Sequence, residues 1–500
     1  MFVRGTTGSA PRTVDPPGNA VSSGRKRIVV DIAMMGVGAT ALALPSFAWP
    51  LTSLDESILL VYADQVRAGL VPHRDFYTVY GPAPFYALAG LFGAFGGSLV
   101  VERAFGLFIH LTVALGCYML GRSRSRMTGL LSGGACLILL APLGSVAYAW
   151  LGAIACLIAA LALAERRGGP THFGAGLMVG LAAAFRPELA IVGLPVLVPF
   201  LWRSSTWRWL VAGFAAGLAP TAWLFVVAGS RMWRNIGPGR AGINGSLRLM
   251  DDPLRSVTLV VAVVGVTSAL VWLALKHRTR SSAAHALLAL AILPQSLQRV
   301  DPEHALYTLC VTVPLVAVAV VGSESPDALR RRKMVLVAMA VAAVGSVMAA
   351  VLRPSPATVA LQFGDRSAVI PLAEYAGLME TRSALLAHAA PGGSLFVGST
   401  DLSRDSITRV AAYHLIPELR PSSYFLDLTG GAASRAGSGL AEDLRRSDVL
   451  LLTPMPEGLM EKVSPYAVRG SDEANSVVRT EFCRVAETGW GVIYAHHPCK

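Results

Sequence analysis

The run IVVDIAMMGVGATALALPSFAWPL at residues 28–51 directly follows Arg25, Lys26 and Arg27. A helix needs about 20 predominantly apolar residues to cross the hydrocarbon core of a bilayer, which is roughly 30 Å thick. The run is longer than the apolar region of about 7 to 15 residues in a cleaved secretory signal. We therefore predict an uncleaved first transmembrane helix with a basic segment at its N-terminal end.

Comparable apolar runs recur along the chain as far as residue 352 and then stop. Of the 500 residues, 53% are hydrophobic and 15% are charged, whereas a soluble globular protein carries about 25% charged residues. Contact with lipid explains the missing charge. The sequence therefore predicts a mainly α fold, a polytopic transmembrane bundle of about eleven helices. The predicted spans start near residues 28, 99, 127, 147, 174, 188, 209, 257, 283, 305 and 334.

The net charge of +12 is spread over short basic clusters between the apolar runs, which indicates membrane topology and not nucleic-acid binding. Each cluster follows an even number of predicted spans, so all share the side of the N-terminus, which the positive-inside rule makes cytoplasmic. An odd number of spans then places the C-terminus outside the cytoplasm, in a multi-pass protein of the cell inner (plasma) membrane. The apolar segment Pro84–Gly97 is too short for a span, and we expect a re-entrant or interfacial helix there.

The composition divides the chain into three parts. Residues 1–24 are rich in Gly, Pro, Ser and Thr, which predicts a disordered cytoplasmic tail. Residues 25–352 form the transmembrane domain, and residues 353–500 form a small extracytoplasmic α/β domain in which short β runs alternate with helical patterns. The expected strands lie at 394–398, 448–452 and 491–495, and the expected helices near 372–389, 404–414 and 473–486.

Two segments of the α/β domain invite a functional interpretation. Gly430–Gly439 is rich in glycine but lacks the Gly-Lys-Ser/Thr ending of a phosphate loop, so we expect a flexible connection. Cys483 and Cys499 could pair in an oxidising compartment, a question that the sequence leaves open. The other four cysteines lie inside apolar runs, where a thiol acts as a small core residue.

Ionisable side chains crowd the first exported loop, residues 52–83, next to a membrane whose other short loops are nearly bare. An acidic pair opens the loop, and the sequences His-Arg-Asp-Phe and Tyr-Gly-Pro precede an apolar half-helix. An ordinary solvated loop would also explain these charges, and that alternative stays open. The candidate site residues of the loop are Asp55, Glu56, His73, Arg74, Asp75 and Tyr80.

In this arrangement the sequence resembles the dolichyl-phosphate-mannose protein mannosyltransferase-like superfamily of membrane glycosyltransferases, which have the GT-C fold. The resemblance covers residues 28–210 well and the rest in layout only. It implies that Asp55, together with Glu56, is the catalytic acid/base site and that the donor is a polyprenyl-phosphate-linked sugar. Such a transferase needs a carboxylate to take the proton of the acceptor hydroxyl while the phosphate leaves, and Asp55 is placed where that base should be.

Two further groups of residues are candidates for substrate binding. Arg186 interrupts an apolar run as part of Arg-Pro-Glu; it could bind an anionic lipid head, or it could hold a corner between two helices. The exported turn at residues 298–304 brings together Arg299, Asp301 and His304, which could bind phosphate or sugar hydroxyls, with a solvated turn as the alternative.

The exported loop at residues 229–257 carries an excess of arginines, against the positive-inside rule. Lipid phosphates are the natural partners of such cations. We expect Arg231, Arg234 and Arg240 to bind the donor phosphate.

The sequence as a whole favours a glycosyltransferase that moves a sugar from a polyprenyl-phosphate donor to a glycan, lipid or protein acceptor at the extracytoplasmic face. Asp-x-Asp, Walker A and Cys/His metal-binding spacings are absent; no cofactor is certain, and a divalent metal stays possible. The alternatives are a transporter or lipid flippase, which would place charges near the middle of several helices, and a non-catalytic scaffold.

Overall fold

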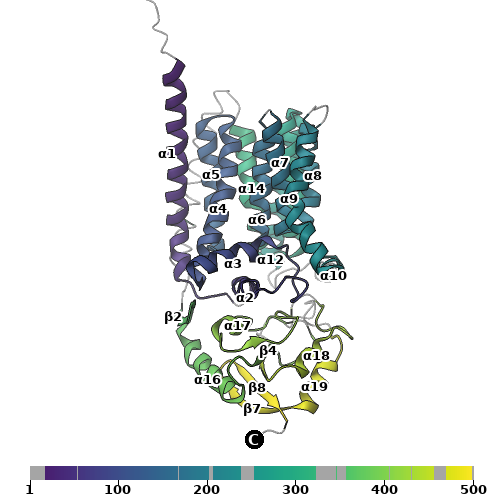
Figure 1. The fold of residues 1–500 in the computed structure, drawn as a ribbon. Coiled ribbons are helices and arrows are strands. Elements are labelled where there is room, and N and C mark those ends of the chain that lie inside the picture. Colours follow the sequence, from purple (N-terminus) through teal and green to yellow (C-terminus); the bar gives the residue numbers. More distant parts are fainter. Residues whose placement is uncertain are drawn as a thin grey trace, which may run out of the picture.

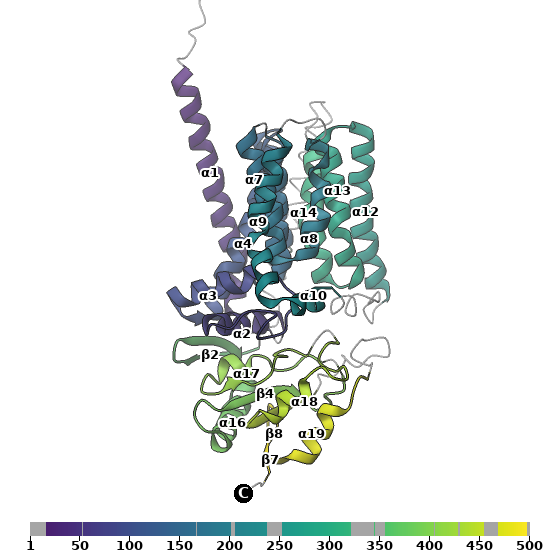
Figure 2. The same cartoon turned by 45° about the vertical axis from the view of Figure 1, so that its right-hand side comes forward.

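The computed structural model describes residues 17–52, 54–166, 168–201, 206–237, 253–321, 345, 356–404, 406–428, 431–454 and 469–497. In these ranges the chain forms two layers, a bundle of long helices and an α/β part that covers one end of it (Figure 1). The short helices α2 (Asp55–Arg67) and α3 (Ala83–Phe95) lie across that end of the bundle, next to the α/β part (Figures 1 and 2). The transverse position of α3 agrees with the predicted interfacial helix.

The bundle has a helix at ten of the eleven predicted span positions, and the one near residue 334 lies outside the described residues. Six of the described helices are long and apolar enough to cross a bilayer, so this is a membrane protein; α3, α6 and α8 are apolar but shorter. The helices and 3-10 turns of the bundle are α1 (Pro17–Ala43), η1 (Leu44–Ala48), α4 (Leu99–Arg122), α5 (Arg126–Leu140), η2 (Ala141–Leu143), α6 (Ala149–Ala164), α7 (Gly169–Phe185), α8 (Pro187–Leu201), α9 (Trp207–Ala228), α10 (Ser230–Ile236), α12 (Pro253–His277), α13 (Arg280–Gln298) and α14 (Pro302–Val321). Helix α1 begins within the tail predicted to be disordered.

Glycines let α7 and α9 pack backbone against backbone. A Cβ on Gly176 of α7 would lie 1.9 Å from the carbonyl oxygen of Leu210, and a Cβ on Gly213 of α9 would lie 1.9 Å from that of Phe173. Membrane helices associate through such small residues, because lipid tails are as apolar as leucine and provide no hydrophobic driving force. This contact fixes α7, whose C-terminal end carries Arg186.

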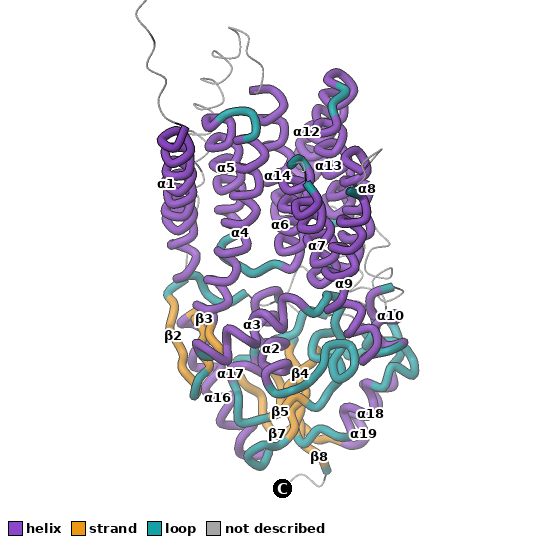
Figure 3. Tube along the Cα trace, turned by 45° about the horizontal axis from the view of Figure 1, so that its top comes forward, coloured by secondary structure: helices purple, strands orange, loops and turns teal. Residues whose placement is uncertain are grey.

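The α/β part contains two sheets (Figure 3). In the smaller sheet, β2 and β3 form an antiparallel hairpin, and the two-residue β1, which precedes α4, pairs in parallel with β3. The larger sheet has the strand order β5-β4-β6-β8-β7, with β5, β4 and β6 parallel and β8 and β7 antiparallel. The elements are β1 (Gly97–Ser98), β2 (Thr358–Phe363), β3 (Arg366–Pro371), α16 (Leu372–His388), β4 (Ser394–Ser399), α17 (Ala412–Leu415), β5 (Arg420–Pro421), α18 (Leu440–Arg445), β6 (Val449–Thr453), α19 (Glu473–Glu481), β7 (Phe482–Thr488) and β8 (Gly491–His496).

The structure confirms the three predicted strands as β4, β6 and β8, and the first predicted helix as α16. Two other helix predictions were wrong in part. Near residues 404–414 only α17 is helical, because Arg404 and Ser406 form β-bridges with Arg469 and Leu428. The helix predicted at 473–486 ends at Glu481, since the residues after it pair with β8 as strand β7.

A buried polar contact joins α2 to the α/β part. The Asp64 carboxylate on α2 lies 2.7 Å from Nδ1 of His414 and 3.2 Å from Nε of Arg366, and Asp64 and His414 are both buried. Because a buried carboxylate is costly unless it is paired, these contacts hold α2 firmly against the C-terminal part. Helix α2 of the first loop is therefore held in one position at the end of the bundle.

Candidate active site

Asp55 is the first residue of α2, and Glu56 follows it. Carboxylates are favoured in the first turn of a helix, where the unpaired N–H groups carry partial positive charge. The turn is closed by two hydrogen bonds: the Thr52 N–H donates to Oε2 of Glu56 (2.8 Å), and the Glu56 N–H donates to Oγ1 of Thr52 (3.3 Å). Asp55 is thus held, half-buried, at the start of a well-defined turn.

Arg103 of α4 holds the side chain of Glu56. Its Nε donates to Oε1 (2.7 Å) and its Nη2 to Oε2 (3.0 Å), and both side chains are at most 2% exposed. Nη1 of Arg103 donates to the carbonyl oxygens of Ser46 (2.7 Å) and Trp49 (2.8 Å). Both oxygens of Glu56 are therefore occupied. We propose that Glu56 positions the turn of Asp55, in place of the catalytic role expected from the sequence.

The exported turn before α14 is organised around Asp301. Its Oδ1 accepts hydrogen bonds from the backbone N–H (2.8 Å) and Nδ1 (2.9 Å) of His304, and its Oδ2 lies 2.9 Å from Nε of Arg299. Burial alone would raise the pKa of Asp301, but the hydrogen bonds from His304 and the charge of Arg299 outweigh it and lower the pKa. The three residues predicted for this turn therefore form one cluster.

Charged side chains of the turn before α14 interact electrostatically with the carboxylate of Asp55. Burial, followed by the negative charge of Glu303, raises the pKa of Asp55 to about 7; His304 and Arg299 oppose this rise, and Asp427 adds to it. A general base works best when its pKa lies near the operating pH. A pKa of about 7 therefore agrees with the role that the sequence predicted for Asp55.

Two cavities adjoin the first turn of α2. A small one of about 60 Å³ is lined by Asp55, Tyr80 and Asp427, among others. A larger one of about 790 Å³ begins at Glu56 and has the guanidinium groups of Arg255 and Arg299 among its walls. The larger cavity therefore presents these two arginines together with the acids Asp301 and Glu303, next to the first turn of α2.

Arg186 lies in the corner between α7 and α8, as one of the two sequence interpretations expected. Its guanidinium is 5.3 Å from the ring centroid of Tyr80 and 5.2 Å from that of Trp150, and its Nε donates to Oε1 of Glu188 (2.8 Å). Cation–π contacts of this kind hold both partners in place. Arg186 therefore supports Tyr80, which lines the same cavity as Asp55.

His73 is completely buried and stabilises the first loop. Its Nε2–H donates to the carbonyl oxygen of Tyr80 (3.0 Å), and its Nδ1 accepts from Nδ2 of Asn235 on α10 (3.2 Å). Burial lowers the pKa of His73 to about 4, so the ring is neutral at neutral pH. His73 therefore joins the first loop to α10, and its contact with substrate stays a prediction.

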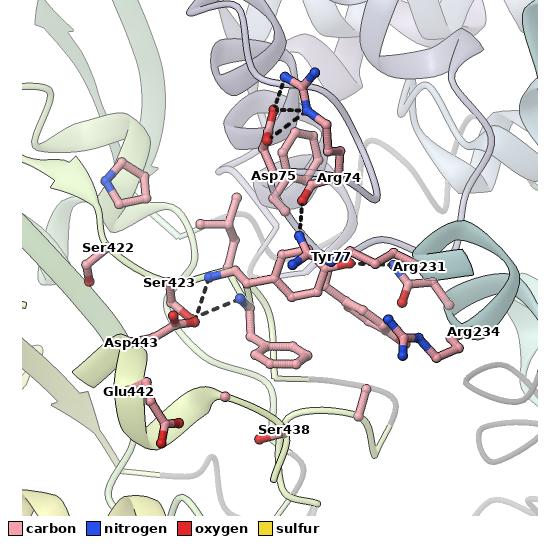
Figure 4. Close-up of a pocket in the computed structure, with 18 of the residues that line it drawn as sticks. Arg74, Asp75, Tyr77, Arg231, Arg234, Ser422, Ser423, Ser438, Glu442 and Asp443 are labelled. Carbon is pink, nitrogen blue, oxygen red and sulfur yellow. Dashed lines mark hydrogen bonds and ion pairs between the residues drawn. The ribbon is translucent and has the colours of Figure 1, made fainter. Parts of the chain in front are cut away.

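The remaining predicted residues surround a third cavity. Arg74 forms an ion pair with Asp75 at 2.7 Å, and Arg231 and Arg234 of α10 lie across from them (Figure 4). These arginines do not line the cavity of Arg255 and Arg299 that adjoins Glu56. Arg240, the third arginine predicted to bind the donor phosphate, lies outside the described residues.

The fold resembles that of solved membrane proteins. ArnT from Cupriavidus metallidurans, in its apo state and bound to undecaprenyl phosphate, matches with a TM-score of 0.59 and 14% identity. The match covers 94% of this chain and 98% of the undecaprenyl-phosphate-bound ArnT. The chain has the GT-C fold. The mycobacterial arabinofuranosyltransferase AftD matches at a TM-score of 0.48 and 15% identity, over 93% of this chain and 40% of AftD.

No protein-family model matches this GT-C chain, and no curated protein matches its sequence. Within the part of the chain that the structure describes, three or more His, Cys, Asp or Glu side chains are nowhere grouped as a metal site would require.

Three residues near Asp55 were not among the predicted site residues, namely Arg103, Glu303 and Asp427. The charged pair of Glu102 and Arg103 inside an apolar run was a usable signal. For Asp427 the sequence carries none, because only the fold brings it to Asp55.

Proposed function

We propose that this protein is a membrane glycosyltransferase that moves a sugar from a polyprenyl-phosphate donor to an acceptor hydroxyl at the extracytoplasmic face. One arrangement in a GT-C fold carries the proposal: Asp55 begins α2, and the next residue, Glu56, lines a cavity together with Arg255 and Arg299. A structure of ArnT, which has a similar fold, contains undecaprenyl phosphate.

In the proposed reaction Asp55 takes the proton of the acceptor hydroxyl as its oxygen attacks the anomeric carbon. The bond between this carbon and the phosphate oxygen breaks, and polyprenyl phosphate leaves with the electron pair. Arg255 and Arg299 face the cavity in which the negative charge of the leaving phosphate would grow. Charge-assisted hydrogen bonds from arginine suit phosphate oxygens and would stabilise this charge.

The donor assignment predicts that Arg299→Gln weakens the binding of undecaprenyl phosphate by about tenfold or more, because a hydrogen bond to a charged group contributes about 1.5–3 kcal/mol. The measurement is a titration of the lipid into protein in phosphatidylcholine nanodiscs, followed by intrinsic tryptophan fluorescence. Arg420→Gln, which removes an exposed arginine of the α/β part, is the matched control and should bind normally. Equal affinity of the wild type and Arg299→Gln would contradict the assignment.

We also propose that the N-terminus is cytoplasmic and that the α/β part is exported. The shared side of the basic clusters supports this orientation. Cys483 is disulfide-bonded, whereas the four cysteines of the bundle are free thiols. Disulfides persist in oxidising compartments and are rare in the cytosol, so this bond also favours export; Cys499, its suggested partner, lies outside the described residues.

Reporter fusions test this orientation. Fusions after Arg126 and Arg280 should report the cytoplasm, and a fusion at the C-terminus should report the exported side. A cytoplasmic C-terminus would contradict the orientation and would place Asp55 on the wrong side for a donor used outside the cell.

A further inference from the structure

We propose that the third cavity, of about 980 Å³, binds the acceptor and that this acceptor is an anionic saccharide. This inference rests on the proposed glycosyltransferase function and adds the chemical class of its second substrate. A volume of this size is typical of a specific small-molecule site.

The walls of the cavity come from three parts of the chain that only the fold brings together (Figure 4). The first loop contributes Arg74, helix α10 contributes Arg231 and Arg234, and the Gly-rich segment 431–439 contributes Arg435. The segment expected to be a mere connection is therefore one wall of a cavity.

The cations of this cavity outnumber the acids that could neutralise them. Asp75 is paired with Arg74, and Asp443 accepts hydrogen bonds from Oγ of Ser423 (3.0 Å) and the N–H of Tyr424 (2.8 Å), which hold the loop above α18. Glu442, the third acid of the lining, lies 3.8 Å from Arg445, so each of the three carboxylates has a partner within its own segment or a neighbouring one. The charge that remains favours a ligand that brings its own negative groups.

Two arginines are available for such a ligand. Arg234 and Arg435 are exposed, and neither has an acidic partner among the residues that the structure describes. Arg231 is fixed beside them, because its Nη1 donates to the carbonyl oxygen of Arg74 (2.6 Å) and its guanidinium lies 5.6 Å from the ring centroid of Tyr424. Arginine forks suit carboxylate and phosphate groups, which they bind through paired hydrogen bonds.

The cavity shares one wall residue with the small cavity of Asp55. Tyr77 lines both this cavity and the small cavity of Asp55, and its N–H donates to the carbonyl oxygen of Tyr424 (2.7 Å). In this proposal a saccharide whose anionic groups lie against the arginines extends past Tyr77 toward Asp55. Only the acceptor needs to present a hydroxyl to this base.

The chemistry of the walls favours a saccharide over the headgroups of bulk membrane lipid. A large share of the lining belongs to the α/β part and includes the hydroxyl groups of Ser422 and Ser438. These groups and the arginines can bond the hydroxyls and anionic groups of a sugar, and polar groups make up more of the exposed lining than apolar groups do.

The test uses full-length protein in phosphatidylcholine nanodiscs, titrated calorimetrically with tetragalacturonate and with neutral maltotetraose. We expect tetragalacturonate to bind at least tenfold more tightly than maltotetraose, and the double variant Arg234→Gln/Arg435→Gln to lose at least tenfold of this affinity. Arg420→Gln should bind like the wild type. Undecaprenyl phosphate should bind the double variant normally, because its proposed site is the cavity of Arg299.

Three results would overturn the inference: no preference for the anionic saccharide, an unchanged affinity in the double variant, or loss of tetragalacturonate binding when phosphatidylglycerol replaces phosphatidylcholine. The last would show that the arginines hold lipid headgroups. If the wild type binds tetragalacturonate but not undecaprenyl phosphate, the donor assignment fails and the anion site stands. If it binds undecaprenyl phosphate only, the acceptor site alone is refuted.

Discussion

Asp55→Asn is expected to lower the rate of sugar transfer by about 10²- to 10⁴-fold, the usual effect of losing a positioned general base. Asparagine keeps the shape of the side chain but cannot accept the proton. The rate is measured in proteoliposomes with a polyprenyl-phosphate sugar, and binding of undecaprenyl phosphate is measured in parallel and should persist. The matched control is Asp472→Asn, at an exposed carboxylate of the α/β part, which should leave the rate unchanged. Near-normal turnover of Asp55→Asn would refute the base assignment.

The pH dependence of the reaction provides a second test of Asp55. Its pKa of about 7 means that the carboxylate is protonated, and cannot act as a base, at lower pH. Transfer by the wild type should therefore increase as the pH rises through about 7. The negative charge of Asp427 contributes to the raised pKa, so Asp427→Asn should shift the acid limb of the rate profile to lower pH. A limb that does not move in this variant would argue against the described environment of Asp55.

Arg103→Met is expected to destabilise the protein by about 3–5 kcal/mol, because it leaves Glu56 buried without its cation. Glu56→Gln should cost less, since the amide oxygen can still accept from the guanidinium. Thermal unfolding in a mild detergent, followed by the loss of monodisperse protein, compares the variants. The double variant Arg103→Met/Glu56→Met should recover part of the stability that Arg103→Met loses, because it removes both charges.

This prediction also separates positioning from catalysis. If Glu56 orients the turn of Asp55, Glu56→Gln should retain much more activity than Asp55→Asn. Equal losses of transfer in the two variants would assign both carboxylates to the chemistry. Stability changes below about 1 kcal/mol in both Arg103→Met and Glu56→Gln would show that the buried pair does not hold the turn.

The sequence predicted the membrane helices well because each span is a local property of about 20 residues. The corner at Arg186, where a proline directly follows a buried charge, was one of two interpretations of the sequence, and the binding of an anionic lipid head was the other. Strand β7 was missed because it is not a local property of the sequence. Residues 482–488 are strand only through their pairing with β8, and no local pattern records that partner.

Individual residues of the candidate site could be predicted from the sequence, but the contacts between them could not. Asp55 and the turn of Arg299 were each visible as ionisable residues in short exported loops. Their common cluster, the pairing of Glu56 with Arg103 and the approach of Asp427 depend on how α2, α4, α14 and the α/β part pack. The burial of His73 depends on the same packing, and this is why its burial was not expected when the sequence predicted contact with substrate.

The most direct test of the central claim is the profile of polyprenyl-phosphate-linked sugars in cells that lack this protein. The account predicts that one such lipid accumulates, that the wild-type gene clears it, and that the gene for Asp55→Asn does not, although the variant reaches the membrane in normal amounts. An unchanged lipid profile in the deletion strain, or clearance by Asp55→Asn, would contradict the claim that this protein transfers a lipid-linked sugar with Asp55 as its base.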